Sequence, residues 1–350
     1  MTLREATPDE RSRWDDLVWA NPGGPELYQL DSYAALKAPV WRPRHLVHEH
    51  EGREPVHALY LTRRLPPFGE LWYCPMGPRV ADADHARACF EDLRAGTFGR
   101  PFAVVLEPSV PAEGPQDAER LVASVPGMRE HPDLQLGQHT VLVDLRPDEE
   151  EILAGFRQRA RRYIRKSSEA VVEHRTDEDA FEVMWRLYDE TLTRAGVQER
   201  RPRAYHENLW RTYLDAGMGH FVLARPREDG DHEAGAFIIH RDGLGYYKDG
   251  GSLRTRDSNG LQYRVQWEAM RWCKERGATT YDMYGAPPSW AADDESHPMH
   301  PLVQFKTAFG PIVDQVGTMQ LVLRPRAFRA WDRVGMPVYR RLTARSGPFY

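Results

Sequence analysis

Apolar and polar positions follow strand periods and helical periods in turn along the chain. Short apolar or alternating runs predict strands at about 44–50, 56–63, 70–74, 101–108 and 140–145, then at 219–225, 233–240, 244–250 and 279–284. Helical spacing predicts helices at about 8–20, 31–37, 148–168, 178–194 and 258–276. Two helices, a series of strands, a helix and another strand recur in both halves. The pattern therefore predicts a mixed α/β or α+β fold with one unit present twice.

The two halves are not divided by a linker. No stretch rich in glycine, serine or proline separates them. We therefore expect the halves to pack against each other with a cleft between them, which is a common place for a ligand.

Composition describes an ordinary globular protein of 350 residues, 41% hydrophobic and 28% charged, long enough for two domains. The formal net charge of -5 excludes a generally basic nucleic-acid-binding protein, but not a local basic patch. Cys74, Cys89 and Cys273 share no metal-ligand spacing, which favours reduced thiols. The N-terminal residues are charged, and no apolar run approaches the roughly 20 residues that span a bilayer. We expect a cytoplasmic protein.

Lysine is rare in this chain. Of 47 cationic residues only five are lysines, namely Lys37, Lys166, Lys248, Lys274 and Lys306. Lys306 lies between Phe305 and Phe309, just before Gly310, where an ammonium in a medium of lowered dielectric could stabilise developing negative charge. Lys37 ends a predicted helix, so it either interacts with the helix dipole or faces an anionic ligand.

The segment 156–166, F-R-Q-R-A-R-R-Y-I-R-K, contains six cations and no acid. On a helix, Arg157, Arg161 and Arg165 share one stripe, which Arg162 and Lys166 extend. Such a stripe suits the phosphates of a nucleic acid or of a membrane surface, although a solvated helix face is an equal alternative.

Two segments combine aromatic and polar side chains. Arg201 and Tyr205 precede an apolar helix, and an arginine fork binds phosphate bidentately. Tyr246 and Tyr247 precede a Gly-Gly turn, so one should face the core and the other the cleft. An ordinary loop and a structural hairpin are the alternatives.

Several common motifs are missing from the sequence. The segment 254–262, R-T-R-D-S-N-G-L-Q, lacks the spacing of the pyrophosphate loop that acetyl-CoA transferases use, and there is no P-loop, dinucleotide fingerprint or G-x-S-x-G elbow. The acidic loop 293–300 is more consistent with a solvated loop than with a metal site, so no metal is predicted.

In combination, six segments resemble the Fem family of aminoacyl-tRNA-dependent peptidyltransferases, the FemA, FemB and FemX type, which build the interpeptide bridge of peptidoglycan. The likeness covers almost the full length. It rests on Y-C-P-M-G-P-R-V (73–80), T-V-L-V-D-L with the basic helix, R-P-R-A-Y, Y-Y-K-D-G-G-S, S-N-G-L-Q-Y-R-V-Q-W with T-T-Y-D-M-Y-G (258–285), and F-K-T-A-F-G (305–310). The coiled-coil arm of some members is missing, which places the chain with the smaller FemX-like enzymes.

The resemblance implies a fold and a set of domains. It implies two acetyltransferase-like domains of GNAT type, the first formed by 1–145 plus 317–350 and the second by 146–316, with a cleft between them. A monomer is expected.

The resemblance also implies an activity and its residues. The activity is transfer of an amino acid, with glycine, alanine or serine expected, from aminoacyl-tRNA to a stem-peptide amine of lipid II or UDP-MurNAc-pentapeptide, without a cofactor. Phe305 and Lys306 would hold the aminoacyl end, and Glu107 is the candidate base. Arg157, Arg161, Arg162 and Arg165 would grip the tRNA, and the precursor would contact Lys37, Arg201, Tyr205, Tyr246 or Tyr247.

The C-terminal run 324–345 holds seven arginines and one acid, interleaved with apolar residues. Its composition suits peripheral contact with the inner face of the plasma membrane, and a helix packed on the first domain is the alternative. Rival functions are a Fem-like enzyme acting on a secondary-metabolite precursor, an acyl-CoA N-acyltransferase, and a non-catalytic protein that binds tRNA or lipid head groups.

Overall fold

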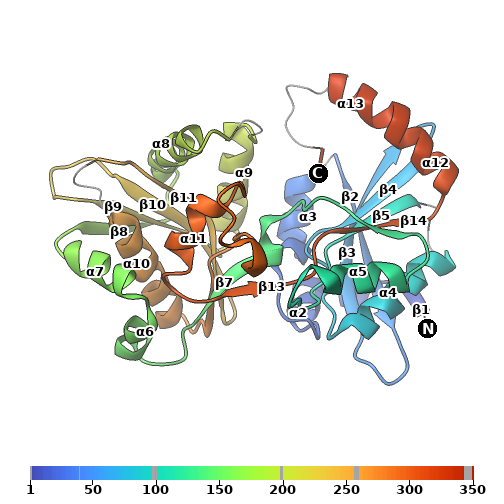
Figure 1. The fold of residues 1–350 in the computed structure, drawn as a ribbon, viewed down its shortest axis with the longest axis horizontal. Helices are drawn as coiled ribbons and strands as arrows, with labels where there is room; N and C mark the ends of the chain where they lie inside the picture. Colours follow the sequence, from blue (N-terminus) through green and yellow to red (C-terminus); the bar gives the residue numbers. More distant parts are fainter. Residues whose placement is uncertain are drawn as a thin grey trace. The chain divides into compact units, whose positions relative to one another are not determined.

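Two units, each with its own seven-stranded mixed sheet and helices on both faces, make up the chain (Figure 1). The structure is a computed structural model that describes residues 2–38, 40–96, 99, 101–197, 200–255, 260–342 and 349–350. Unit 1 comprises Met1–Gln138, Asp314–Arg345 and Tyr350, and unit 2 comprises His139–Val313 and Ser346–Phe349. The mixed α/β class predicted from the sequence is confirmed.

Unit 1 contains strands and helices from both ends of the chain. Its strands are β1 (Thr2–Glu5), β2 (Arg42–Glu49), β3 (Val56–Leu65), β4 (Gly69–Cys74), β5 (Pro101–Leu106), β6 (Met128–Glu130) and β14 (Met319–Val322). Its helices are α1 (Pro8–Ser12), α2 (Trp14–Trp19), η1 (Leu27–Gln29), α3 (Asp31–Lys37), α4 (Ala83–Ala95), α5 (Pro115–Ser124), η2 (Leu136–Gln138), α12 (Pro325–Ala330), η4 (Trp331–Gly335) and α13 (Met336–Leu342).

Unit 2 is formed by the middle of the chain. Its strands are β7 (His139–Asp144), β8 (Val171–Arg175), β9 (Gly219–Arg225), β10 (Ala234–Arg241), β11 (Leu244–Ser252), β12 (Thr280–Asp282) and β13 (Ile312–Asp314). Its helices are α6 (Glu149–Gly155), α7 (Gln158–Lys166), α8 (Asp179–Arg194), α9 (Arg203–Asp215), α10 (Leu261–Glu275), η3 (Ser289–Ala291) and α11 (His300–Lys306).

The two sheets share one spatial arrangement of strand directions, although the sixth strand comes last along the chain in unit 1 and first in unit 2. The strand order is β1-β2-β3-β4-β5-β14-β6 in unit 1, and β8-β9-β10-β11-β12-β7-β13 in unit 2. The fourth and fifth strands are parallel in each sheet, β4 with β5 and β11 with β12, and a long helix connects them, α4 or α10. In both sheets the sixth strand, β14 or β7, pairs antiparallel with the fifth. The recurring order of elements in the sequence thus corresponds to a repeated fold.

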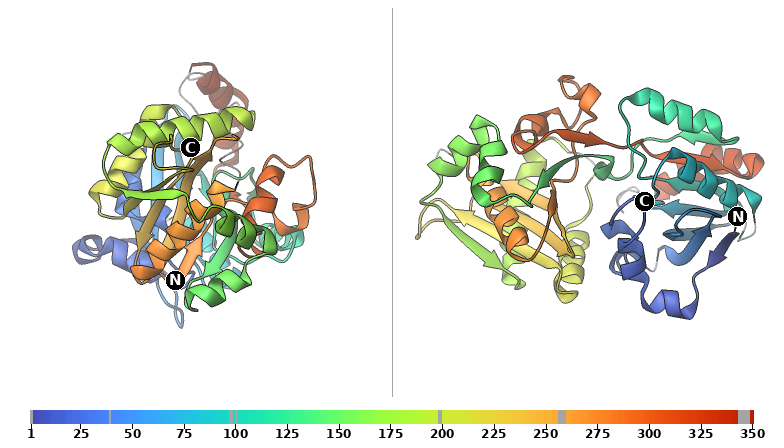
Figure 2. Two further views of the ribbon diagram at one scale, coloured as in Figure 1. Left: turned by 90° about the vertical axis from the view of Figure 1, so that its left-hand side faces the viewer. Right: turned by 90° about the horizontal axis from the view of Figure 1, so that it is seen from below.

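Helices cover both faces of each sheet. In unit 1, apolar side chains of α4 and α5, such as Phe90 and Leu121, pack on one face with Val104 and Leu106 of β5. The blue helices α1 to α3 lie on the opposite face (Figure 2, right). In unit 2, α6, α7 and α10 cover one face and α8 and α9 the other (Figure 1). Burial of these apolar faces is the main force that holds each unit together.

Three predicted helices differ from the structure. The predicted helix 8–20 is divided at Arg13, and the predicted helix 148–168 is divided at Phe156 and Arg157, both of which are extended. The Phe156 ring is buried in the core of unit 2, which explains why the chain leaves the helical path there. Helix α10 begins at Leu261, after the left-handed Gly260, and the preceding residues 256–259 of the S-N-G-L-Q segment lie outside the described residues.

Candidate functional site

Lys306, the last residue of α11, is buried inside unit 2. Its side chain is 5% exposed, and its Nζ donates hydrogen bonds to the carbonyl oxygens of Tyr284 and Gly285. The nitrogen lies 5.7 Å from the centroid of the Tyr247 ring. The amine predicted from sequence to be sheltered is therefore not in bulk solvent.

The turn after β12 presents those two carbonyl groups. Tyr284 and Gly285 both have positive φ, 44° and 77°. A tyrosine in the left-handed region is costly, and such residues concentrate at functional sites. Asp282 braces the turn, because its carboxylate accepts hydrogen bonds from the Tyr284 N–H at 2.7 Å and from the Thr140 hydroxyl at 2.5 Å.

Burial lowers the pKa of Lys306 to about 7, with Lys248 adding to the shift and Asp282 opposing it. With that pKa the amine can lose its proton near neutral pH, whereas the sequence analysis treated it as an ammonium. An ammonium has three N–H donors. Within the described residues two of them have partners, which leaves one for a ligand.

The aromatic ring that faces Lys306 Nζ differs from the expected ones. Phe305 and Phe309 pack on Tyr263 of α10, at ring-centroid distances of 5.0 and 5.6 Å. Their role in the structure is to fix α11 on α10. Tyr247 provides the ring beside the amine.

Strand β11 brings four consecutive side chains, 246–249, to this region. The register with β10 shifts between Phe237 and Ile238, so Lys248 is the extra residue of a bulge. Tyr246 is buried with its ring 5.1 Å from that of Tyr284, and Lys248 Nζ lies 5.0 Å from the same ring. Tyr246 and Tyr247 therefore both lie in this region, whereas the sequence did not decide which of the two would.

The Gly-Gly pair that follows makes room for this arrangement. A Cβ on Gly250 would lie 1.7 Å from the Tyr247 hydroxyl, and one on Gly251 would lie 2.3 Å from the backbone of Leu187 in α8. Gly250 thus allows the Tyr247 ring to fold back along the strand, and Gly251 allows α8 to approach.

A buried carboxylate, Asp249, follows Lys248. It accepts a hydrogen bond from Trp210 Nε1 at 2.8 Å, and it lies 3.6 Å from His206 Nδ1 and 3.7 Å from Lys248 Nζ. Burial works to raise the pKa of Asp249, but Lys248, His206 and Trp210 hold it well below its usual range. The site therefore contains a fixed negative charge beside Lys248.

Arg201 and Tyr205 lie beside this carboxylate group. The Arg201 guanidinium carbon is 4.8 Å from the Tyr205 ring centroid, and that ring is 5.7 Å from the His206 ring. Tyr205 lies in the first turn of α9 rather than ahead of the helix, and burial raises its pKa. We call the resulting group the unit 2 site: Arg201, Tyr205, His206, Tyr246, Tyr247, Lys248, Asp249, Tyr284 and Lys306.

Four members of the unit 2 site were not predicted: His206, Lys248, Asp249 and Tyr284. The scarcity of lysine was a usable signal for Lys248. Asp249 and Tyr284 lay within the segments Y-Y-K-D-G-G-S and Y-D-M-Y-G, but their roles depend on the bulge and on the left-handed turn.

In unit 1, Glu107 follows β5 and is completely buried. Its Oε2 accepts hydrogen bonds from the Tyr73 hydroxyl at 2.7 Å and the Met76 N–H at 2.9 Å. Its Oε1 accepts from the Gln135 N–H at 2.9 Å and the Thr318 hydroxyl at 3.2 Å. Burial raises the pKa of Glu107 despite these donors. Four protein donors on one carboxyl group indicate a structural role, and its role as a base stays a prediction.

Lys37 belongs to the same part of unit 1. It is 7% exposed, and its Nζ lies 5.3 Å from the Tyr33 ring centroid. The Gln135 amide donates to the hydroxyls of Tyr33 at 3.4 Å and of Tyr73 at 3.0 Å, which connects this pair to Glu107. Lys37 is also the last residue of α3, so the helix-dipole alternative holds as well.

The predicted basic stripe lies on α7. Arg157 precedes the helix, Arg161 donates to the Ala154 carbonyl at 2.9 Å, and the exposed Arg162 and Arg165 line a pocket of about 510 Å³ with Gln158 and Lys166. Across the described residues, no carboxylate lies within 4.0 Å of any of these cations. The lining of this pocket in unit 2 thus contains three cations and no acid.

The C-terminal run is divided between core and surface. Phe328 and Trp331 are buried on unit 1 against Phe102, at ring-centroid distances of 6.5 and 6.2 Å. Val334 and Val338 are exposed. Residues 343–345 lie outside the described residues. In the part of the chain that the structure describes, no helix has the length and apolar character needed to cross a bilayer.

Comparisons with known proteins support this architecture. Residues 154–294 match the family described as Acetyltransferase (GNAT) domain. The crystal structure of FemX is similar to this chain with a TM-score of 0.75 and 18% identity, and the match covers 94% of this chain and 99% of FemX. The similarity to FemX shows the fold of this chain, which is a two-domain GNAT arrangement.

Two other solved structures are less similar. L-PGS from Bacillus licheniformis has a TM-score of 0.47 and 14% identity, covering 98% of both chains. A tandem GNAT protein from the clavulanic acid biosynthesis pathway has a TM-score of 0.47 and 13% identity, covering 91% of this chain and 98% of that one. No curated protein matches the sequence. The family match and the FemX-like fold support a transferase of acyl groups.

Proposed function

We propose that the chain transfers an amino acid, with glycine, alanine or serine expected, from aminoacyl-tRNA to the stem-peptide amine of a peptidoglycan precursor, either lipid II or UDP-MurNAc-pentapeptide. The observation that carries the proposal is the buried amine of Lys306, held by two carbonyl groups and one aromatic ring in a chain with the fold of FemX.

The reaction needs no cofactor, because the aminoacyl ester is already activated. The acceptor amine attacks the ester carbonyl, the bond from that carbon to the ribose oxygen breaks, and an amide forms. The proton lost by the amine ends on the ribose hydroxyl. Holding ester and amine in line lowers much of the barrier.

Lys306 has two roles that its pKa of about 7 allows. Protonated, its third N–H can donate to the carbonyl oxygen as negative charge develops there. Neutral, it can accept the proton that the attacking amine loses. We favour the protonated role, because the two carbonyl acceptors stabilise a charged amine.

The remaining residues would bind the substrates. Arg201 offers a guanidinium for a precursor phosphate, and Tyr205, Tyr246 and Tyr247 offer rings and hydroxyls beside it. Lys37 is a further candidate for the precursor in unit 1. Arg157, Arg161, Arg162 and Arg165 would contact tRNA phosphates.

The experiment is a transfer assay with a pool of charged tRNAs and each purified precursor in turn, read by the mass of the product. A product heavier by one aminoacyl residue, absent when the tRNA is uncharged, supports the proposal. Transfer of acetyl from acetyl-CoA without any tRNA product would instead support an acyl-CoA N-acyltransferase. No transfer product under any condition would refute the proposal.

A further inference from the structure

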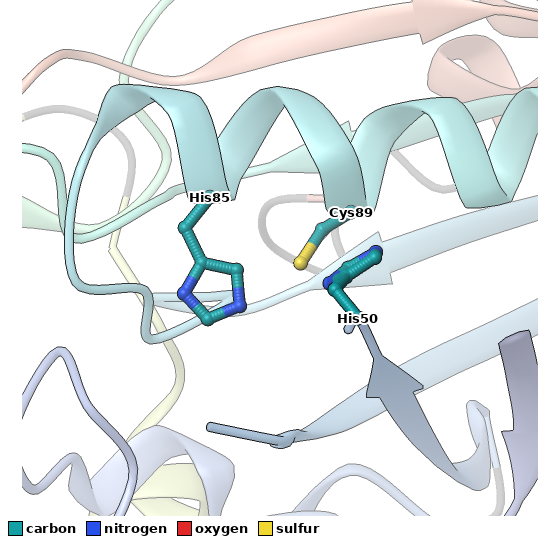
Figure 3. A group of neighbouring side chains, drawn as sticks. All are labelled: His50, His85 and Cys89. Carbon is teal, nitrogen blue, oxygen red and sulfur yellow. The ribbon is translucent and has the colours of Figure 1, made fainter. Parts of the chain in front are cut away.

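A second group of reactive side chains lies in unit 1, apart from the residues used above. His85 and Cys89 are four residues apart on α4, so both project from one face of the helix. His50 follows the end of β2. Figure 3 shows the Cys89 sulfur projecting from α4 between the His85 and His50 rings. One ligand atom from each of the three lies within 4.8 Å of the others.

These side chains are buried and incompletely hydrogen-bonded. His50 is 8% exposed, His85 1% and Cys89 0%. Among the described residues, neither the buried His50 Nδ1 nor the buried His85 Nε2 has a hydrogen-bond partner. A buried polar atom without a partner costs free energy, and a ligand bound by these two nitrogens would offset that cost.

A carboxylate orients one of the rings. Asp92, one turn beyond Cys89 on α4, lies with Oδ2 2.9 Å from His50 Nε2 and 2.9 Å from His48 Nδ1. The proton on His50 Nε2 donates to Asp92, so Nδ1 carries the lone pair. A carboxylate that fixes the tautomer of a ligating histidine is a typical outer partner of a metal site.

We propose that His50, His85 and Cys89 bind one divalent first-row transition metal of the zinc class, with Asp92 as the orienting carboxylate. Two imidazoles and a thiolate are the ligands that Zn²⁺ and its neighbours prefer over Mg²⁺ or Ca²⁺. In a tetrahedral zinc site the ligand atoms lie about 3.3 to 3.7 Å apart, so each pair would close by no more than about 1.5 Å on binding.

Three protein ligands leave a fourth position for water or another small ligand. A pocket of about 480 Å³ adjoins the group, lined by His50 and by residues that flank His85 and Cys89 on α4. Its wall carries the acids Glu51, Asp84 and Glu91 as well as Arg53 and Arg87. The pocket provides a path for a cation, and the bound metal would tie the end of β2 to α4.

The test is a cobalt titration of the tag-free, reduced chain, because Co²⁺ reports its ligands in its absorption spectrum. We expect one Co²⁺ per chain, a thiolate-to-cobalt charge-transfer band, and displacement by Zn²⁺. Replacing both other thiols (Cys74→Ala with Cys273→Ala) should keep the band, and Cys89→Ala should remove it. We expect Asp92→Asn to weaken Zn²⁺ binding by about 10 to 100-fold.

Each variant of the cobalt titration has a result that would overturn the proposed metal site. A wild-type chain that takes up no stoichiometric Co²⁺, or takes it up without a thiolate band, overturns the site. A band that survives in Cys89→Ala, or that disappears when only Cys74 and Cys273 are replaced, assigns the thiolate elsewhere and overturns it too. If Cys89→Ala does not fold, as judged by circular dichroism, the double replacement still decides, because Cys89 is then the only thiol in the chain.

Discussion

The two units place opposite charges at corresponding points of the same fold. Unit 1 buries Glu107 just after the fifth strand of its sheet, and unit 2 buries the amine of Lys306 against the turn that follows its fifth strand. Each buried charge touches a non-glycine residue in the left-handed region, Met76 with φ of 47° and Tyr284 with φ of 44°. Burial shifts both pKa values toward neutrality, upward for Glu107 and downward for Lys306.

The backbone decides the sign of each charge. Where a strand pair ends, backbone groups lose their ladder partners and need others. Unit 1 presents the N–H groups of Met76 and Gln135, which a carboxylate accepts. Unit 2 presents the carbonyl oxygens of Tyr284 and Gly285, which an amine satisfies.

The two charges differ in how completely they are satisfied. Glu107 accepts four hydrogen bonds from described residues, whereas Lys306 donates two of its three. We infer that Glu107 has a structural role in unit 1 and that Lys306 can donate its third hydrogen bond to a substrate. The predictions below test this division.

The largest effect on stability should come from Glu107→Ala. It leaves the N–H groups of Met76 and Gln135 without their acceptor, at about 1 to 3 kcal/mol each, so we expect unit 1 to lose about 2 to 6 kcal/mol of unfolding free energy. Denaturant unfolding measures this. Glu113→Ala, which removes an exposed acid of the same unit, should change stability by less than about 0.5 kcal/mol. A Glu107→Ala chain of normal stability that lacks transfer activity would instead make Glu107 the base.

The largest effect on activity should come from Lys306→Met. Loss of a donor to the developing charge should lower kcat by about 100 to 1,000-fold. The variant leaves the carbonyl groups of Tyr284 and Gly285 without their donor, but it also removes a buried amine with a depressed pKa. The two effects oppose each other, so its stability at pH 7 should not fall by more than about 1 kcal/mol. Steady-state transfer kinetics and denaturant unfolding are the measurements.

Lys274→Met is the matched control. Lys274 also donates to backbone carbonyls, those of Leu145 and Pro147, both at 2.6 Å, but it lies outside the unit 2 site. It should lose stability and keep its kcat. Equal loss of kcat in Lys306→Met and Lys274→Met would contradict the inference that Lys306 acts on the substrate.

The pH dependence should separate the two roles of Lys306. If the protonated amine acts, the Lys306-dependent rate falls as pH rises through about 7, and if the neutral amine acts, it rises. The pH dependence of the unfolding free energy tests the depressed pKa of Lys306 independently of the reaction rate. The unfolded state has the ordinary, higher lysine pKa, so above pH 7 it binds more protons than the folded state, and unfolding free energy should rise with pH.

The difference between wild type and Lys306→Met isolates that contribution. It should grow by up to about 1.4 kcal/mol per pH unit between pH 7 and 10. A difference that is flat over this range would show that the folded pKa is not depressed.

Much of this could be predicted from the sequence, because period and turn residues are local signals. Strand β9 was predicted at its observed bounds. Among the residues predicted for the site, Arg201 lies over the Tyr205 ring and Lys306 beside the Tyr247 ring, and their roles stay predictions. The partners of Lys306 could not be predicted, since they depend on the left-handed Tyr284. The approach of His50 to Cys89 depends on how α4 packs on the sheet, although the His85-to-Cys89 spacing was a local signal.

The smallest effect concerns the basic surface of α7, which distinguishes unit 2 further. Arg162, Arg165 and Lys166 are exposed and line one pocket. If they contact tRNA phosphates, replacing Arg162 and Arg165 by alanine should raise KM for aminoacyl-tRNA and leave kcat unchanged. The slope of log affinity against log salt should fall by about 0.7 to 0.9 for each phosphate that the variant no longer binds.

The control is Arg326→Ala with Arg329→Ala, which removes two exposed arginines of α12 in unit 1. An equal change of slope in both double variants would mean that tRNA responds to overall charge, and α7 would then be an ordinary solvated helix.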